Sequence, residues 1–88
     1  MVRRRVIVHG RVQGVFFRDT VRRLAVQRQL VGTVANQADG TVEAVFEGSP
    51  EDVDALVDLC RHGPERASVE RVEVFEEEPE GLDGFRVL

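Results

Sequence analysis

The spacing of apolar residues in the first third of the chain predicts a short strand followed by a helix. Val6 and Val8 alternate with other residues over 5–9, which places both on one face of a strand. Over 17–30 the apolar residues instead recur with a helical period and form one stripe: Phe17, Val21, Leu24 and Ala25. The arginines of this segment mostly lie off that stripe and face water.

Two further strands and a tight turn follow. The strands are predicted over 31–36 and 41–47, with the turn at 37–40 between them. The turn contains Asp39 and Gly40, and both residue types tolerate the left-handed backbone angles that a tight hairpin requires. The pattern therefore predicts a β-hairpin.

The second half of the chain repeats this plan, with clear signals at both ends of its helix. Ser49 is a typical N-cap, and Pro50 suits the first helical position. Gly63 and Pro64 end the helix, which is predicted over 50–62. Its apolar stripe consists of Val53, Leu56, Val57 and Cys60.

The C-terminal residues predict one more strand and a short addition to the sheet. The strand is predicted over 69–75, with Val72 and Val74 facing inward. An acidic, solvated loop is predicted over 76–83, and 84–88 have room for a short fifth strand.

The order β-α-β-β-α-β is typical of a ferredoxin-like split β-α-β sandwich, an α+β fold. Two helices then pack on one face of an antiparallel sheet with strand order 4-1-3-2. The first and second strands run in the same direction on either side of the third, so their C-terminal ends open at the same edge. Arg18 follows the first strand and Asn36 ends the second, which places them about 10 Å apart at the backbone.

Composition narrows the classes of protein to which this fold can belong. The 88 residues suffice for a single domain, 1–88. The chain has no lysine, which excludes a Walker-type phosphate loop, and its net charge of −4 argues against a nucleic-acid binder. The one cysteine, Cys60, cannot form an intramolecular disulfide, and no apolar run near the N-terminus suits a signal peptide or membrane span. A cytoplasmic protein without a membrane partner is expected.

The loop between the first strand and the first helix has the composition of an anion-binding site. Residues 8–18, VHGRVQGVFFR, contain two glycines and end in Arg18. Backbone N–H groups in the first turn of a helix have no intrahelical partner and lie at the positive end of the helix dipole. The guanidinium of Arg18 adds a planar pair of donors that suits phosphate oxygens. This segment therefore predicts a site for a phosphoryl group.

Two ordered motifs give the chain a resemblance to the acylphosphatases that extends over essentially its whole length. Residues 8–18 resemble the first signature of that family, and 32–36 (GTVAN), with Gly40, Val42 and Gly48, resemble the second. The resemblance implies an enzyme without metal or cofactor that hydrolyses the carboxyl-phosphate bond of small acyl phosphates. Inorganic phosphate is then its product and competitor, and a monomer is expected.

The resemblance also implies roles for individual residues. Asn36 orients the attacking water, since a carboxamide cannot act as a general base near neutral pH. The leaving carboxylate has a conjugate acid with a pKa of about 4, so no side-chain acid has to protonate it. Weak dependence of kcat on pH near neutrality is therefore expected. Arg18 binds the substrate phosphate, assisted by backbone amides of the loop: Gln13, Gly14, Val15, Phe16, Phe17 and Arg18.

Two residues depart from the second signature. Thr33 stands where an aromatic residue is common, and Ala35 stands where a basic or longer side chain is frequent. The second change weakens the positive field beside Asn36. Neither removes a residue with a direct chemical role.

Other polar and aromatic residues are assigned structural roles. His9 is expected to be a strand residue, although a sharp pH optimum in kcat would implicate it in the reaction. His62 lies near a helix C-terminus, where its positive charge is favourable, and with Cys60 it provides too few ligands for a metal site. Phe16 and Phe17 are expected to pack in the core rather than to stack on bases.

Two functions of other classes stay open. A small-ligand binding or regulatory module would hold phosphate in the same loop without turnover. Domains that resemble this family also begin larger carbamoyl-transfer maturation proteins. Because no linker follows the last predicted element, an independent enzyme is expected. Incubation with benzoyl phosphate or acetyl phosphate in the presence of a chelator separates turnover from binding.

Overall fold

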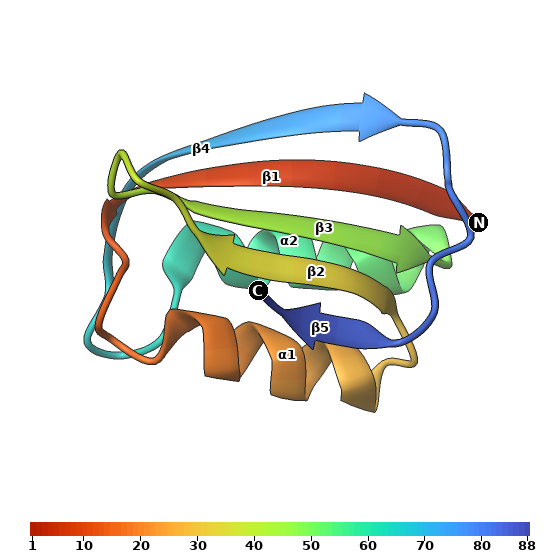
Figure 1. Cartoon of the computed structure of the whole chain (residues 1–88), viewed down its shortest axis with the longest axis horizontal. Coiled ribbons are helices and arrows are strands. Elements are labelled where there is room, and N and C mark those ends of the chain that lie inside the picture. Colours follow the sequence, from red (N-terminus) through yellow and green to blue (C-terminus); the bar gives the residue numbers. More distant parts are fainter.

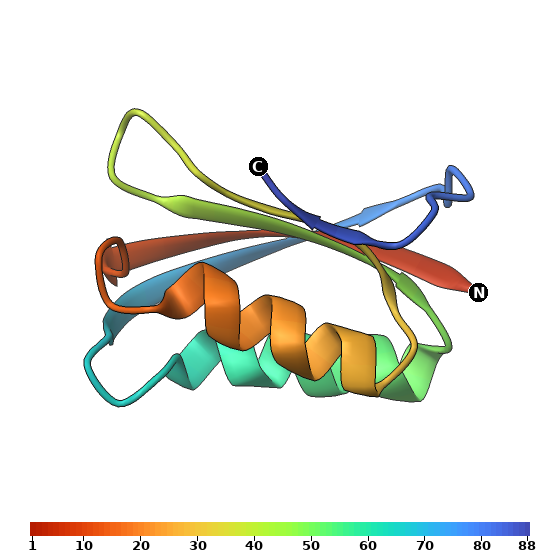
Figure 2. The same cartoon turned by 60° about the horizontal axis from the view of Figure 1, so that its bottom comes forward.

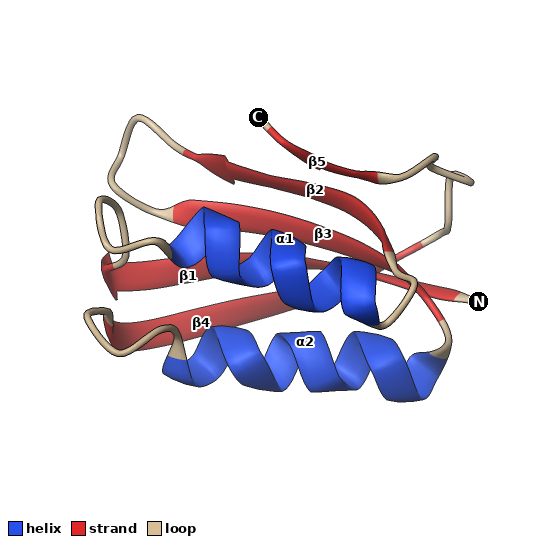
Figure 3. Ribbon diagram, turned by 90° about the horizontal axis from the view of Figure 1, so that it is seen from below, coloured by secondary structure: helices blue, strands red, loops and turns tan.

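The chain folds into one five-stranded sheet that carries both helices on a single face. The computed structural model describes all 88 residues. Figure 1 shows the elements in chain order, and Figures 2 and 3 show the two helices side by side beneath the sheet. The predicted element order is confirmed, including the short fifth strand. The elements are β1 (Val2–Arg11), α1 (Phe17–Gln27), β2 (Val31–Asn36), β3 (Val42–Gly48), α2 (Pro50–His62), β4 (Ser68–Glu77) and β5 (Phe85–Val87).

The sheet is mixed, with the strand order β4-β1-β3-β2-β5. β1 lies antiparallel to β3 and β4, and β3 lies antiparallel to β2, as the predicted 4-1-3-2 order requires. The fifth strand, for which no direction was predicted, runs parallel to β2. β4 ends beside the start of β1, and the following loop crosses to the opposite edge at that same end (Figure 1). β5 therefore starts there and runs in the direction of β1 and β2.

The core lies between the sheet and the two helices. Val6 and Val8 of β1 are fully buried, as their alternation predicts, and Phe46 of β3 is fully buried beside them. The helical stripes face this core, although Leu24 is only partly buried. Cys60 is fully buried in this core, and burial raises the pKa of its thiol to about 12, so it is a packing residue and not a nucleophile. Neither helix has the length and hydropathy needed to cross a membrane.

Some element bounds differ from the prediction for identifiable reasons. β1 and β4 each extend over ten residues, and where β1 begins beside the end of β4, Arg3 and Arg5 both pair across the strands with Glu77. Ion pairs thus accompany the ladder at this end, beyond the apolar alternation. α1 ends at Gln27, since Gln29 adopts a left-handed backbone with φ of 59° and ends the helix without a glycine. β2 and α2 have the predicted bounds.

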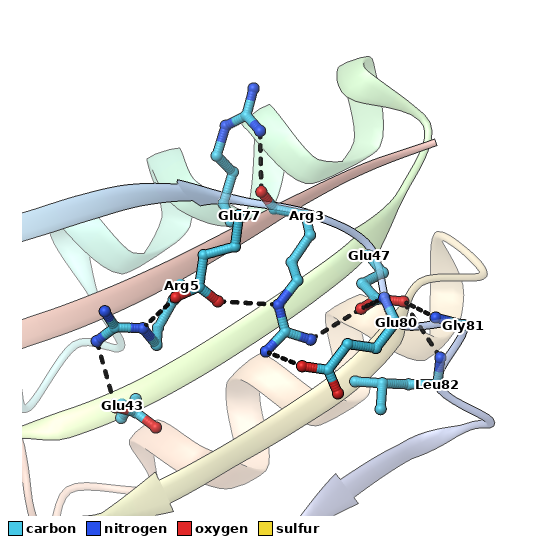
Figure 4. A network of polar contacts seen from close by, with 9 residues as sticks. Arg3, Arg5, Glu43, Glu47, Glu77, Glu80, Gly81 and Leu82 are labelled. Atoms are coloured by element: carbon cyan, nitrogen blue, oxygen red, sulfur yellow. Dashed lines mark hydrogen bonds and ion pairs between the residues drawn. The ribbon is translucent and has the colours of Figure 1, made fainter.

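A buried carboxylate holds the loop between β4 and β5. Glu47, near the end of β3, is fully buried and pairs with Arg3 Nη1 at 2.8 Å (Figure 4). The prediction of a solvated acidic loop over 76–83 is therefore wrong in part, because this loop is tied to the sheet by its backbone. Glu47 accepts hydrogen bonds from three consecutive backbone N–H groups of the loop, at 2.8, 3.0 and 3.2 Å: Glu80, Gly81 and Leu82.

The anchored loop determines where β5 enters the sheet. Burial opposes ionisation of Glu47, but its hydrogen bonds to the loop amides and to Arg3 outweigh burial and hold its pKa below the ordinary value. Just beyond the loop, the Phe85 ring stacks on Phe46 with centroids 5.8 Å apart. These contacts bring Leu88, the last residue, to the neighbourhood of α1.

Candidate active site

The backbone after β1 turns sharply toward the start of α1. The pairing of β1 with β4 shifts register between His9 and Gly10, where a bulge bends the strand. Gly10 has a φ of 123°, and a side chain there would collide with the carbonyl oxygen of Ser68. Gly14 has a φ of 73°, a left-handed conformation that glycine adopts at little cost. Both glycines of the predicted anion loop therefore allow backbone conformations that this loop requires.

A cavity of about 380 Å³ opens where this loop meets the C-terminal end of β2. Figure 1 shows the loop and the β2–β3 turn at the same end of the sheet. Arg18, from the first turn of α1, and Asn36, the last residue of β2, both line this cavity. They thus share one cavity although they come from separate elements. The full lining is Val12, Gly14, Phe16, Phe17, Arg18, Asp19, Asn36 and Val87.

The start of α1 presents unpaired backbone donors to this cavity. The first intrahelical hydrogen bond runs from the Thr20 N–H to the Phe16 carbonyl at 3.1 Å. No side chain caps this helix, whereas Ser49 caps α2 by accepting from the Asp52 N–H. The N–H groups of Phe17 and Arg18 therefore stay free of helical partners at the positive end of the helix dipole. This arrangement suits an anion.

The charged side chains at the cavity have opposite signs. Arg18 Nη1 donates a hydrogen bond of 3.3 Å to the carbonyl oxygen of Leu88, which leaves its other guanidinium donors for a ligand. Asp19 is exposed, lines the same cavity and offsets part of the Arg18 charge. The positively charged part of the site is therefore small and consists of the Arg18 guanidinium and the start of α1.

The side chain of Gln13 joins the anion loop to the β2–β3 turn. Its Nε2 donates to the carbonyl oxygens of Gln37 at 2.8 Å and Thr41 at 3.0 Å. Gln37 directly follows Asn36, so the side-chain amide of Gln13 links the anion loop to the residue next to Asn36. Gln13 and Val15 do not line the cavity, and Val15 is buried in the core. The sequence predicted a role only for the backbone amide of Gln13, because the partners of its side chain depend on tertiary contacts.

The β2–β3 turn has its own internal support. Asp39 Oδ1 accepts hydrogen bonds from the Thr41 hydroxyl at 2.7 Å and from the Thr41 N–H at 3.0 Å. These bonds lower the pKa of Asp39, the hydroxyl contributing most. Gly40 adopts a φ of 92°, as expected for the predicted turn. The turn that follows Asn36 is thus held at both of its ends.

The prediction for the two adjacent phenylalanines is half correct. Phe17 is buried in the core, but Phe16 is 68% exposed and lies at the rim of the cavity. Phe16 is the N-cap of α1 and has a left-handed backbone with φ of 65°. This conformation turns its side chain away from the core. Hydrophobic spacing cannot reveal that reversal, because it is set by the loop backbone.

Other residues with reactive side chains lie outside the cavity. His9 Nε2 is 2.6 Å from Glu73 Oε1, and neither side chain lines the cavity. His62 lies in the last turn of α2, near the helix C-terminus as predicted. No three side chains of His, Cys, Asp or Glu converge as a metal site would require.

Fold and cavity together define a small α+β domain with an uncapped helix start that borders a cavity at one end of its sheet. A model of the acylphosphatase family matches residues 4–87. The acylphosphatase of Haloarcula marismortui is 54% identical over 85 residues, which are 97% of this chain and 93% of that protein. The chain belongs to the acylphosphatase family, which is a family of hydrolases. Membership of this family implies a small acyl phosphate as substrate.

Solved structures agree with this assignment. The crystal structure of acylphosphatase from Bacillus subtilis matches with a TM-score of 0.95 and 37% identity, over 100% of this chain and 99% of that chain. Full-length HypF, in its phosphate- and nucleotide-bound form, matches with a TM-score of 0.91 and 27% identity. That match covers 99% of this chain but 12% of HypF. The same fold therefore also occurs as a segment of a larger protein.

Proposed function

We propose that the cavity at the start of α1 binds the phosphoryl group of a small acyl phosphate and directs water onto its phosphorus atom. The observation that carries this proposal is that Arg18, Asn36 and the uncapped start of α1 border one cavity. A permanent cation and free backbone donors bind the dianion, and a neutral carboxamide faces it. The products are a carboxylate and inorganic phosphate.

Arg18 and the amides of the loop bind the phosphoryl oxygens. The planar guanidinium contacts two oxygens at once, and this charge assistance strengthens both hydrogen bonds. The same donors stabilise charge on the equatorial oxygens in the transition state, so Arg18 contributes to both binding and turnover. Among the loop residues, Gly14, Phe16 and Phe17 border the cavity together with Arg18.

Asn36 holds the attacking water in line with the bond that breaks. Its carboxamide does not titrate near neutral pH, so its contribution is orientation and not proton abstraction. The water oxygen bonds to phosphorus while the bond between phosphorus and the acyl oxygen breaks. The carboxylate leaves with that electron pair, and a phosphoryl oxygen takes the water proton. The leaving carboxylate needs no acid, because its conjugate acid has a pKa of about 4.

Gln13 acts as a positioning residue for this pair. Its two hydrogen bonds join the phosphate-binding loop to the turn that follows Asn36. The distance between phosphate and water therefore depends on a tertiary contact and not on either loop alone. Small errors in such a distance reduce rates strongly, because in-line attack requires near-contact geometry.

We propose that the enzyme acts as a monomer, since the residues assigned to phosphate binding and water orientation all belong to one copy of the chain. The single cysteine is buried and unpaired, which suits a reducing compartment, and we place the enzyme in the cytoplasm. Sedimentation at assay concentrations tests the first statement, and cell fractionation tests the second.

Hydrolysis of a defined substrate tests the proposed function. Purified protein is incubated with benzoyl phosphate and with acetyl phosphate in the presence of a chelator, and phosphate release is measured. Release above the uncatalysed rate is expected, with competitive inhibition by inorganic phosphate. Binding of phosphate without release would instead mark the domain as a binding module, which is the alternative that the fold allows.

A further inference from the structure

Phe16 combines an unusual backbone conformation with an exposed ring. Its backbone has a φ of 65°, which is rare for an aromatic residue and which glycine adopts without steric cost. Its ring is 68% exposed, so it contributes little to the core. A bulky residue thus occupies a position where glycine would suit the backbone better. Strained, exposed residues of this kind gather at ligand sites.

The ring of Phe16 shares the cavity with a second exposed apolar side chain. Val87 of β5 is 43% exposed and lines the same cavity. Val12 and Phe17, which are almost fully buried, complete an apolar lining beside the polar end. The volume of about 380 Å³ falls in the range of small-molecule sites, roughly 300–1,000 Å³, and so leaves room beyond a phosphoryl group.

The charges around the cavity restrict what the remaining room can hold. The phosphoryl group takes the positive end, which consists of Arg18 and the helix start. The other charged side chain that lines the cavity is Asp19, which is exposed and anionic. An acyl group with a second negative charge would meet Asp19 without a matching cation.

We propose that Phe16 and Val87 bind the acyl half of the substrate and select uncharged, apolar acyl groups, with aromatic ones preferred. This inference rests on the proposed function and adds the class of acyl group. Phe16 is the N-cap of α1 and lines the same cavity as Arg18, so the ring is within the cavity that holds a phosphate bound at the helix start. An aromatic acyl group gains stacking contact with Phe16, which a two-carbon acyl group cannot provide.

The ratio of two specificity constants tests this inference. For the wild type we expect a higher kcat/KM with benzoyl phosphate than with acetyl phosphate. In Phe16→Gly this ratio should fall about tenfold, because a ring-ring contact contributes up to about that factor. Inhibition by inorganic phosphate should change less than about twofold, since the amides and Arg18 remain.

Control variants separate recognition of the acyl group from general damage. Val26→Ala removes another exposed apolar side chain of α1 that lies outside the cavity, and its ratio should stay at the wild-type value. Phe16→Tyr keeps the ring and should keep most of the preference. If Phe16→Gly unfolds, Phe16→Asn repeats the comparison, because asparagine also tolerates a left-handed backbone.

Two outcomes would overturn the inference in distinguishable ways. If the wild type hydrolyses both substrates and Phe16→Gly leaves their ratio unchanged, the acyl-binding role is wrong and the proposed function stands. If the wild type hydrolyses neither substrate, the proposed function fails and this inference fails with it.

Discussion

Replacing Glu47 by glutamine removes the charge that holds the loop between β4 and β5. The carboxylate accepts three backbone hydrogen bonds and pairs with Arg3 Nη1 at 2.8 Å, and it is fully buried. A carboxamide of the same shape can accept with its oxygen only. Its NH₂ group would face either the Arg3 guanidinium or the loop amides, all of which are donors.

The expected loss of stability follows from the fate of Arg3. Removing one partner of a buried ion pair costs about 3–5 kcal/mol, because the other charge stays buried. Arg3 keeps Glu77 at 2.9 Å and Glu80 at 3.4 Å, so the lower end of that range applies. For a domain of this size, a loss of about 3 kcal/mol lowers Tm by roughly 12–24 °C.

The effect of Glu47→Gln should depend on pH in a defined direction. Because the folded-state pKa of Glu47 is lowered, its contribution is complete above the unfolded-state pKa and is lost as pH falls through the folded pKa. The difference in unfolding free energy between wild type and Glu47→Gln should therefore be largest near neutral pH and shrink in acid. The other carboxyl groups titrate in both proteins, so their contributions to the unfolding free energy cancel in this difference.

Urea unfolding of wild type and variant at about pH 7 and about pH 3 measures that difference. Glu76→Gln is the matched control, since Glu76 is exposed and lies 3.6 Å from Arg4 at the surface, where a pair contributes little. A variant as stable as the wild type at neutral pH would refute the anchoring role of Glu47. So would a loss of stability that does not change with pH.

Two further substitutions test the loop and its bulge. Gln13→Ala removes two hydrogen bonds but leaves each acceptor carbonyl one backbone partner, so unfolding free energy should fall by only about 1–2 kcal/mol. Its kcat should fall at least tenfold with little change in phosphate inhibition, and an unchanged kcat would contradict the positioning role. Gly10→Ala forces a side chain onto the Ser68 carbonyl at a φ of 123°, and thermal melting should show a loss of about 2 kcal/mol or more. Melting at the wild-type temperature would mean that the bulge tolerates a side chain.

Local signals in the sequence predict most of the elements, because short-range chemistry determines them. α2 begins and ends as predicted, since Ser49 caps its first turn and Gly63 ends it. The hairpin forms where Asp39 and Gly40 predict it. The direction of β5 was not predicted because it depends on where the preceding loop crosses the sheet, which no local pattern records.

Features that depend on tertiary contacts were not predicted. Alternation along β3 places the side chain of Glu47 on the other face of the sheet from Phe46, away from the helices. This alternation gives no sign that a loop distant in the sequence covers Glu47. Phe16 was assigned to the core together with Phe17, whereas its left-handed backbone turns it outward. The positions of Arg18 and Asn36 at one cavity follow from strand order, so the sequence could anticipate them.

We propose that Arg18 binds the phosphoryl group while Asn36 orients water without binding phosphate. Steady-state kinetics of Arg18→Ala and Asn36→Ala with benzoyl phosphate, together with the inhibition constant for inorganic phosphate, test it most directly. Asn36→Ala should lower kcat by about 100-fold or more and leave the inhibition constant nearly unchanged. Arg18→Ala should weaken phosphate binding and lower kcat together. Wild-type turnover in Asn36→Ala, or unaltered phosphate inhibition in Arg18→Ala, would contradict the account.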